Sequence, residues 1–481
     1  MRRFLLDHAA KDPVSFHMPG HKGSDIFRRY GYGDFLDHIA DCDITEIPGA
    51  DNLFQAEDII MRTQEKYASL YGADHSYLLI NGTSGGLIAS ILASVKPGGK
   101  LIMARNCHKS VFNAAALGQI TPVYAHPDLL QKLGITGAVQ PEEIRRCLDE
   151  APDAEAVILP SPNYYGICSD IEKIAAIVHE AGKILIVDQA HGAHLKFFHK
   201  FGYGDGMPLA AEDAGADLVV GSIHKTLASF TQSAVLNLCS RRVDRYVLED
   251  KLQAIQSTSP SYILMGSLDL NADLLLEHGP EAIGQWRENV DWFYREAARI
   301  DGLSLLDTPG LDRTKINIDM SQHGISGAAL EKLLMDDEIY SELYTGNLLM
   351  FMTGIGNTRA HMERAVAALR KIASAGQPEK VNTMNPDGID AESLPAPSPG
   401  ALHSVPGSRE FVPLQQAAGR ICAGSIIPYP PGIPLVCPGE EITEEVISWI
   451  SQLRSEGEKV IGVNDRGEVL VGSEPSCQPP A

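Results

Sequence analysis

The sequence predicts an α/β fold in which a mostly parallel β-sheet carries helices on both faces. Seven short apolar runs between residues 77 and 238 are continuous rather than alternating, which is typical of strands buried on both faces. Segments of helical composition separate these runs, and such alternation favours a parallel sheet. Apolar residues make up 44% of the 481-residue chain and charged residues 21%, a balance typical of globular proteins.

The predicted sheet region contains the strands and helices that follow, in chain order. Strands are expected at residues 77–80, 101–104, 122–125, 156–159, 184–187, 217–220 and 234–238. Helices are expected at residues 85–95, 141–150 and 171–181. Because the strands are short and each is followed by a polar or helical segment, they fit successive strand–helix units.

The rest of the chain divides into four further parts. Residues 1–70 contain several Gly and Pro turns and predict an irregular N-terminal arm, whereas residues 71–300 form the large domain and end in a mainly helical stretch interrupted at 257–261. Residues 301–375 predict a small α+β domain, with strands near 316–319 and 348–353 and helices near 327–336 and 359–373. A linker is expected at 376–408, because that segment is rich in Pro, Gly and Ser. Residues 409–481 form a small C-terminal domain that closes with a hairpin over 459–471 and frays from 474.

Charge and cysteine content exclude several classes of protein. The net charge of −22 argues against a nucleic-acid or anionic-membrane surface, which needs clustered Lys and Arg. The eight cysteines include no C-x-x-C pair, so no metal site is expected, and reduced thiols in the cytoplasm are the simplest interpretation. The apolar stretch at the N-terminus is too short for a signal peptide, and no apolar run approaches the roughly 18 residues that span a bilayer.

Polar and small residues follow four of the predicted strands. Ligands bind at the carboxyl ends of such strands, so these positions are the candidate site. Each has an ordinary alternative: a helix cap for the Gly/Ser/Thr loop, an N-cap for the Asp, a residue near a helix start for the first His, and a surface position for the Lys. The candidates are Thr83, Ser84 and Gly85 after the first strand, His108 after the second, Asp188 and His191 after the fifth, and Ser222, His224 and Lys225 after the sixth.

Together these residues are the parts that pyridoxal phosphate (PLP) needs. The Gly/Ser/Thr loop at a helix start suits a phosphate group. A half-buried lysine has a lowered pKa, and its amine can bond to the aldehyde of the cofactor. A carboxylate keeps the pyridine nitrogen protonated, and an imidazole can stack on the ring.

The sequence resembles the fold-type-I (aspartate aminotransferase-like), PLP-dependent Orn/Lys/Arg decarboxylases in their shorter bacterial form. The resemblance covers nearly the whole chain, and its blocks stand in the order of the family. They are Ser15–Gly23, Asn81–Gly86, Arg105–Ser110, Asp188–His194, Ser222–Lys225, Thr258–Tyr262, Tyr429–Pro434 and Pro438–Glu440.

The resemblance implies a role for each candidate residue. Lys225 is the residue that carries the cofactor, Asp188 pairs with the pyridinium nitrogen, and His108 stacks on the ring. His191 occupies a position that contacts the phenolic oxygen in related enzymes. The phosphate contacts fall to Thr83, Ser84, Gly85, Ser222 and His224, and the large domain is then the PLP-binding domain.

The resemblance also implies a homodimer, or a higher homo-oligomer, with the active site at the subunit interface. Either the 258–262 turn or the His17–Lys22 arm then serves the neighbouring subunit, and a clasp within the same chain is the alternative for the arm. One position departs from the family: Gln189 stands where the family usually has Glu. Because side chains alternate along a strand, Gln189 is expected to point away from Asp188 and to alter an outer contact or proton relay.

The expected reaction is decarboxylation of a basic L-amino acid, as in polyamine biosynthesis. Arginine to agmatine is favoured by the likeness to biosynthetic arginine decarboxylases, while lysine to cadaverine and ornithine to putrescine stay open. Lys225, His224 and His108 are candidate proton donors. The cationic side chain of the substrate needs carboxylates, for which Glu46, Asp51 and Glu440 are candidates. The alternatives are a PLP-dependent aminotransferase or lyase, and a catalytically silent homologue that binds polyamines.

Overall fold

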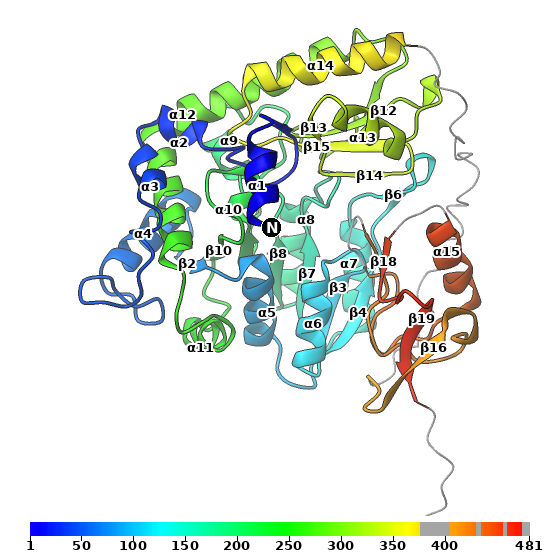
Figure 1. Cartoon of the computed structure of the whole chain (residues 1–481). Helices are drawn as coiled ribbons and strands as arrows, with labels where there is room; N and C mark the ends of the chain where they lie inside the picture. Colours follow the sequence, from blue (N-terminus) through cyan, green and yellow to red (C-terminus); the bar gives the residue numbers. More distant parts are fainter. Residues whose placement is uncertain (376–404, 430–433, 456–458, 474–481) are drawn as a thin grey trace, which may run out of the picture.

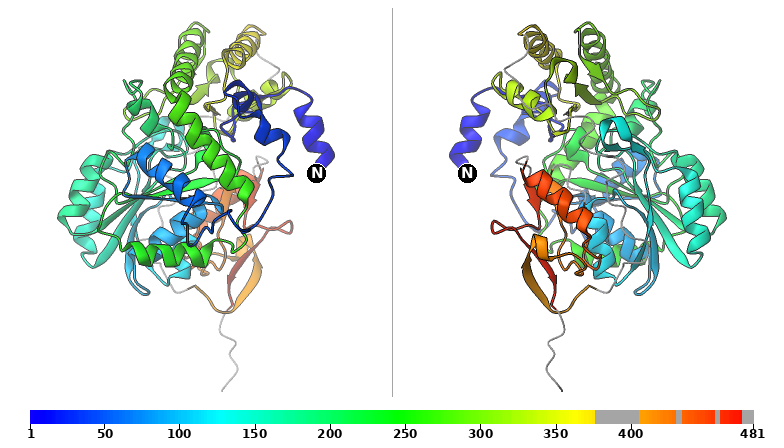
Figure 2. Two further views of the ribbon diagram at one scale, coloured as in Figure 1. Left: turned by 90° about the vertical axis from the view of Figure 1, so that its left-hand side faces the viewer. Right: turned by 90° about the vertical axis from the view of Figure 1, so that its right-hand side faces the viewer.

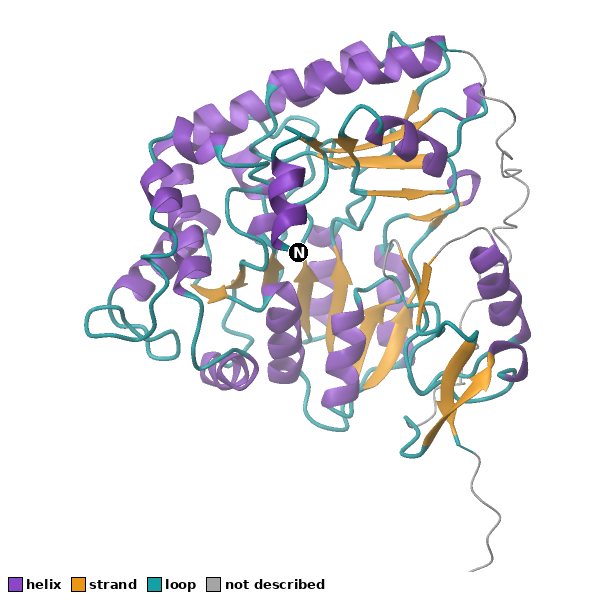
Figure 3. Ribbon diagram, viewed as in Figure 1, coloured by secondary structure: helices purple, strands orange, loops and turns teal. Residues whose placement is uncertain are grey.

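A seven-stranded sheet forms the centre of the protein. Figures 1 and 3 show it in a computed structural model, which describes residues 1–375, 405–429, 434–455 and 459–473. Four of its six strand pairings are parallel and the two made by β10 are antiparallel, so the predicted mostly parallel sheet is confirmed. All seven expected strands are present. In spatial order they are β2 (His75–Leu79), β10 (Ala234–Leu238), β9 (Leu218–Gly221), β8 (Ile184–Asp188), β7 (Ala154–Pro160), β3 (Lys100–Ala104) and β4 (Thr121–Ala125).

Helices cover both faces of this sheet (Figure 2), which explains why its strands are apolar on both sides. Val157, Ile158 and Leu159 in β7 are successive residues, and each is completely buried. The helices of this part are α5 (Gly82–Ser94), α6 (Lys109–Leu117), α7 (Pro141–Glu150), α8 (Ile171–Glu180), α9 (Leu195–Lys200), α10 (Ile223–Thr226) and α11 (Arg245–Ile255). After β4 in the chain, β5 (Leu129–Leu130) and β6 (Ile135–Thr136) pair as a small antiparallel ribbon.

The N-terminal segment is more regular than expected. It contains α1 (Arg2–Ala9), β1 (Val14–Ser15), α2 (Asp25–Arg29), α3 (Gly33–Asp37) and α4 (Ile59–Tyr71). The expected irregular arm is therefore wrong for α4, where Ile60, Thr63, Tyr67 and Leu70 recur at helical spacing and are buried. β1 pairs in parallel with β13 (Ile339–Tyr340), so the arm joins the second half of the chain.

A second, antiparallel sheet lies beyond the large one, at the top of Figure 1. Its strands are β11 (Ser304–Leu305), β12 (Lys315–Asp319), β15 (Leu348–Met352) and β14 (Leu343–Thr345), in that order. The helices α13 (Gly327–Met335) and α14 (Arg359–Ser374) pack with it, and the long α12 (Tyr262–Ala297) reaches it from the large domain. The expected strands and helices of this region are present, and the domain boundaries at 70, 300 and 375 remain predictions.

The C-terminal unit has its own small core. Its elements are β16 (Arg409–Pro413), β17 (Ile427–Tyr429), α15 (Glu444–Ser455), β18 (Lys459–Ile461) and β19 (Glu468–Gly472). The predicted hairpin over 459–471 is wrong, because β18 pairs with β17 and β19 pairs with β16. A single bridge between Val463 and Val469 joins the two segments. Most of the predicted linker (376–404) and the predicted frayed end (474–481) lie outside the described residues.

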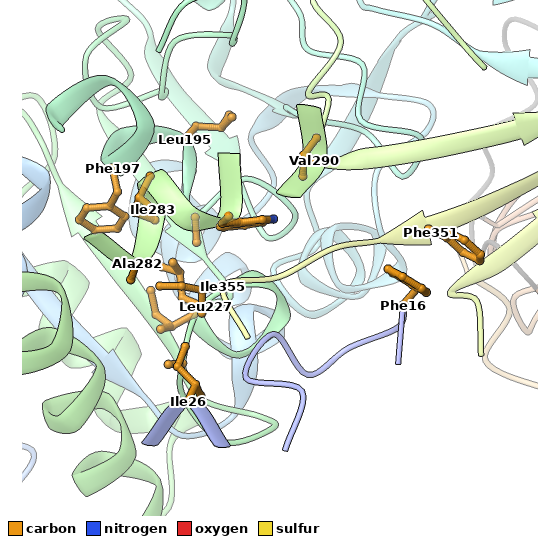
Figure 4. Close-up of a cluster of buried hydrophobic side chains, with 14 of the residues drawn as sticks. Phe16, Ile26, Leu195, Phe197, Leu227, Ala282, Ile283, Val290, Phe351 and Ile355 are labelled. Atoms are coloured by element: carbon orange, nitrogen blue, oxygen red, sulfur yellow. The ribbon is translucent and has the colours of Figure 1, made fainter. Parts of the chain in front are cut away.

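A buried apolar cluster connects the arm, α12 and the small sheet (Figure 4). The Phe16 ring stacks on the Phe351 ring, with 4.3 Å between centroids. Leu227, two residues after Lys225, belongs to the same cluster, so the loop that carries Lys225 rests on a packed core. In the described part of the chain, no helix has the length and apolar character to cross a bilayer, and no cluster of three or more His, Cys, Asp or Glu could hold a metal ion.

Candidate active site

A cavity of about 210 Å³ opens at the carboxyl ends of the large-sheet strands. Eight of the nine residues predicted from the sequence line it: Thr83, Ser84, His108, Asp188, His191, Ser222, His224 and Lys225. Gly85 does not line the cavity, because it lies inside α5 against Asn81 and Ile255. A larger hollow of about 700 Å³ lies elsewhere, between α4, β2 and α11, and holds none of these residues.

Lys225 lies in the short helix α10, directly after β9. Its Nζ is 3.0 Å from Nε2 of His191. Burial lowers the pKa of Lys225, the carboxylates of Asp188 and Glu342 oppose this shift, and the ammonium of Lys315 adds to it. A lowered pKa makes more of the amine neutral near pH 7, and the neutral amine is the form that reacts with an aldehyde.

Asp188 ends β8 on the cavity side and is only 5% exposed. Its Oδ1 accepts a hydrogen bond from the backbone N–H of Ala190 at 3.1 Å. Burial raises the pKa of Asp188, and the nearby Lys225 lowers it. A buried carboxylate with one such bond has capacity left for a cationic or protonated partner in the cavity.

The N-terminus of α5 forms the anion-binding side of the cavity. Gly82, Thr83 and Ser84 stand at the start of this helix, where unpaired backbone N–H groups and the helix dipole attract negative charge. The hydroxyl of Ser222 donates to that of Thr83 at 3.3 Å, which joins the loops after β9 and β2. The group is therefore suited to a phosphate.

Two histidines in the cavity are neutral near pH 7. Burial lowers the pKa of His108 to about 4, with the charge of Lys225 as the next cause. His108 also caps α6, since the backbone N–H of Ser110 donates to its Nδ1. Burial likewise lowers the pKa of His224 to about 4, and its Nδ1 lies 2.8 Å from the carbonyl oxygen of Ser233.

Two buried polar atoms of the cavity residues have no partner among the described residues. They are Oδ1 of Asn106 and Nδ1 of His191. Buried polar atoms in folded proteins are nearly always paired, so these two atoms indicate a place for a polar ligand. Together with the phosphate-binding side, Lys225 and Asp188, they fit PLP.

Sequence reasoning missed one wall of the cavity. Asn106, Pro162, Asn163 and Tyr164 also line it, and the Tyr164 ring lies 4.8 Å from that of His191. The signal was available, because residues 161–164 directly follow a predicted strand, as the other candidates do.

Glu342 is a second residue that sequence reasoning missed. Its Oε2 accepts a hydrogen bond from the backbone N–H of Met18 at 2.9 Å, and its charge acts on Lys225 to raise the pKa of that residue. It lies between β13 and β14, so no sequence pattern near the candidate site marks it.

None of the three carboxylates expected to select the substrate lines the cavity. Asp51 accepts hydrogen bonds from four backbone N–H groups of residues 52–60, and it therefore organises its own loop. Glu440 accepts from the backbone N–H of Cys437 at 2.7 Å and pairs with Arg105 at 3.2 Å. Glu46 is exposed on the surface.

The His17–Lys22 arm packs against the Lys225 loop of its own chain. The backbone N–H of Gly20 donates to the carbonyl oxygen of His224 at 2.7 Å. A Cβ on Gly20 would lie 2.3 Å from the carbonyl carbon of Thr226, so only glycine fits. These contacts support the clasp interpretation of the arm.

Gln189 points away from the cavity, as the alternation of strand side chains predicts. Its Nε2 donates to Oε2 of Glu212 at 2.8 Å, and its Oε1 accepts from the backbone N–H of Ala211 at 2.7 Å. The amide therefore satisfies a partly buried carboxylate without touching the cavity.

Comparison with known proteins decides the family. Residues 1–292 match the model of the Orn/Lys/Arg decarboxylase major domain, and residues 390–466 match that of the C-terminal domain. The chain belongs to the Orn/Lys/Arg decarboxylase family. The arginine decarboxylases of Halalkalibacterium halodurans and Bacillus subtilis are each 32% identical to it, over 96% of this chain and 94% of theirs.

A solved structure shows the same fold. The constitutive lysine decarboxylase of Escherichia coli superposes with a TM-score of 0.74 at 21% identity, covering 95% of this chain and 79% of its own. The expected fold-type-I architecture of this decarboxylase family is thus confirmed.

Proposed function

We propose that this Orn/Lys/Arg decarboxylase uses PLP, held by Lys225, to convert arginine to agmatine and CO2. The observation that carries the proposal is the cavity in which Lys225, Asp188 and the α5 N-terminus meet. PLP, when bound, supplies an electron sink for the electron pair left at Cα as the carboxylate departs. The arginine decarboxylases that match nearly the whole chain support arginine as the substrate.

Different residues of the cavity bind and orient different parts of the cofactor. The α5 N-terminus, with Ser222, holds the phosphate, and Asp188 holds a proton on the pyridine nitrogen. The neutral ring of His108 offers a flat face for stacking. Lys225 would hold the cofactor through its amine, and the same amine would be placed to donate a proton to Cα of the substrate. Because the pKa values of His108 and His224 are lowered to about 4, neither ring is protonated near pH 7, and Lys225 would be the donor when its amine carries a proton.

Glu342 is the candidate carboxylate for the cationic side chain of the substrate. It carries negative charge near Lys225 and forms no salt bridge within 4.0 Å to any cation of the described chain. Its exposure is intermediate, and its Oε2 is fixed by Met18. A guanidinium group can form two parallel hydrogen bonds to such a carboxylate, whereas an ammonium cannot.

We also propose a homodimer. Two large apolar side chains that line the hollow between α4 and α11, Met61 and Tyr246, are exposed. Their burial in a second copy would remove apolar surface from water. Sedimentation velocity should give twice the mass of the chain.

One assay tests the proposed reaction. PLP-loaded protein receives arginine, lysine or ornithine in separate reactions, and CO2 and amine are quantified. Agmatine with equimolar CO2 is expected from arginine, at a kcat/KM at least about tenfold above the other two. Formation of pyridoxamine phosphate without CO2 would indicate an aminotransferase, and no product with any substrate would contradict the proposal. Glu342→Gln should raise the KM for arginine about tenfold or more, whereas Glu46→Gln should leave it unchanged.

A further inference from the structure

A second group of charged residues is buried directly beside the cavity, and the proposed reaction does not use it. Asp312, Lys315 and His194 are each 0% exposed. Oδ2 of Asp312 lies 3.1 Å from Nζ of Lys315 and 3.1 Å from Nε2 of His194. Oδ1 of Asp312 accepts from the hydroxyl of Thr314 at 2.7 Å and from its backbone N–H at 3.0 Å. Burying an ion pair is costly, so this pair needs an explanation.

The group connects the small sheet to two neighbours of the Lys225 amine, His191 and Thr226. Lys315, the first residue of β12, donates from Nζ to the backbone carbonyl oxygen of His191 at 2.8 Å. His191 in turn lies 3.0 Å from the Lys225 amine through its Nε2. On the other side, Nδ1 of His194 lies 3.2 Å from the hydroxyl of Thr226, the residue after Lys225.

The same segment also fixes the cavity wall. The backbone N–H of Asp312 donates to the carbonyl oxygen of Gly166 at 2.8 Å. The side-chain amide of Asn317 donates to the carbonyl oxygen of Tyr165 at 2.8 Å. A Cβ on Gly166 would lie 2.8 Å from Cβ of Lys315, so the wall loop and β12 are in close contact.

We propose that Lys315 is a positioning residue for the Lys225 amine. Lys315 anchors the His191 loop and keeps a fixed positive charge near that amine. Asp312 holds the Lys315 ammonium in place, so that the charge and the anchor stay together. The proposal rests on the proposed use of Lys225 as the cofactor-carrying amine, since a neutral amine is the reactive form.

Other charges act on Lys225, and the charge of Lys315 is opposed by two of them. Burial and Lys315 lower the pKa of Lys225, while Asp188 and Glu342 raise it. The ionisable groups that face the amine are Asp188 from β8, Glu342 from the β13–β14 turn, Lys315 from β12, His191 from the loop after β8, His108 from the start of α6 and His224 from α10. Without Lys315, the two carboxylates would favour a charged amine.

The test measures the pKa of Lys225 in the PLP-free full chain, so it does not depend on decarboxylation. The lysines are methylated reductively with ¹³C-formaldehyde, and the pH dependence of each ¹³C resonance is followed by NMR. The Lys225→Arg variant assigns the resonance. Lys315→Met should raise the pKa of Lys225 by about one unit, because a like charge is removed. Asp312→Asn should lower it, because an attractive negative charge is removed while the bond to the His191 carbonyl oxygen keeps the Lys315 ammonium in place.

Shifts of the Lys225 pKa in opposite directions in Lys315→Met and Asp312→Asn are the result that this role predicts. A purely structural role would loosen the site in both variants, admit water and raise the pKa of Lys225 in both. Shifts in the same direction, or no shift in Lys315→Met, would overturn the proposal.

Two further variants complete the design. Lys315→Gln removes the charge but keeps a donor for the His191 carbonyl oxygen, so it replaces Lys315→Met if that protein does not fold, and the same rise is expected. Lys371→Met is the matched control, because Lys371 pairs with Asp337 at 3.0 Å on the surface and is 71% exposed. It should leave the Lys225 resonance unchanged. If the agmatine assay fails while these shifts are found, the proposed reaction is wrong and the positioning role stands.

Discussion

Two neighbouring clusters of this protein contain the same three residue types, Asp, Lys and His, yet differ in what surrounds them. Asp188, His191 and Lys225 line a cavity, and Nδ1 of His191 is buried without a partner. In the second cluster, the carboxylate of Asp312 has partners on both oxygens, and neither Lys315 nor His194 has an unpartnered buried atom. Spare hydrogen-bonding capacity facing a cavity thus distinguishes the candidate catalytic cluster from the supporting one.

The largest expected effect is the loss of activity when Lys225, in the candidate catalytic cluster, is replaced. Lys225→Met should lower kcat for arginine at least about ten-thousandfold, because the amine that holds the cofactor is lost. Its free energy of unfolding without PLP should stay within about 1 kcal/mol of the parent or increase, since functional sites often cost stability. Steady-state kinetics and urea unfolding measure the two quantities. Retention of even a tenth of the activity would contradict the assignment.

For the supporting cluster, the expected loss is in stability and not in activity alone. Lys315→Met should lower the free energy of unfolding by about 3–5 kcal/mol, because it leaves the carboxylate of Asp312 in the interior without its cation. Urea unfolding of the PLP-free protein measures this loss. A change below about 1 kcal/mol would mean that water reaches the pair, and the contrast between the clusters would disappear.

The first cluster could be predicted from the sequence, and the second could not. The strands are recognisable as local apolar runs, and the carboxyl ends of parallel strands share one edge, so Asp188 and Lys225 were expected together. Lys315 and Glu342 reach that edge from the small sheet, through contacts with residues more than 100 positions away. Such contacts depend on how the two sheets pack, which no local pattern encodes. For the same reason the sequence could not show that Asp51 and Glu440 lie outside the cavity of their own chain.

Glu440 offers a smaller and more specific test. Glu440→Gln should lower the free energy of unfolding by about 1–3 kcal/mol, because the Arg105 side chain is only 11% exposed and loses its charged partner. The KM for arginine should stay within about twofold of the parent, because the Glu440 carboxylate is already held by Arg105 and by the backbone N–H of Cys437. A tenfold rise in KM without loss of stability would restore Glu440 as a substrate ligand.

The last expected effect is the pH dependence of stability. The pKa values of His108 and His224 are lowered to about 4 in the folded chain and return to about 6.5 on unfolding. The unfolded chain therefore binds more protons between pH 6.5 and 4, and stability falls as the pH falls through this window. Each histidine contributes up to about 1.4 kcal/mol per pH unit. Urea unfolding of the PLP-free protein at several pH values should show a shallower slope in His108→Gln/His224→Gln, and an unchanged slope would contradict the buried, neutral state of these rings.

The most direct measurement concerns the amine of Lys225 itself. The protein is loaded with PLP, reduced with borohydride and digested, and the peptides are analysed by mass spectrometry. The cofactor should be found covalently attached to the peptide that contains Lys225, with none on Lys22 or Lys315. Attachment to another lysine, or none at all in protein that decarboxylates arginine, would contradict the central claim.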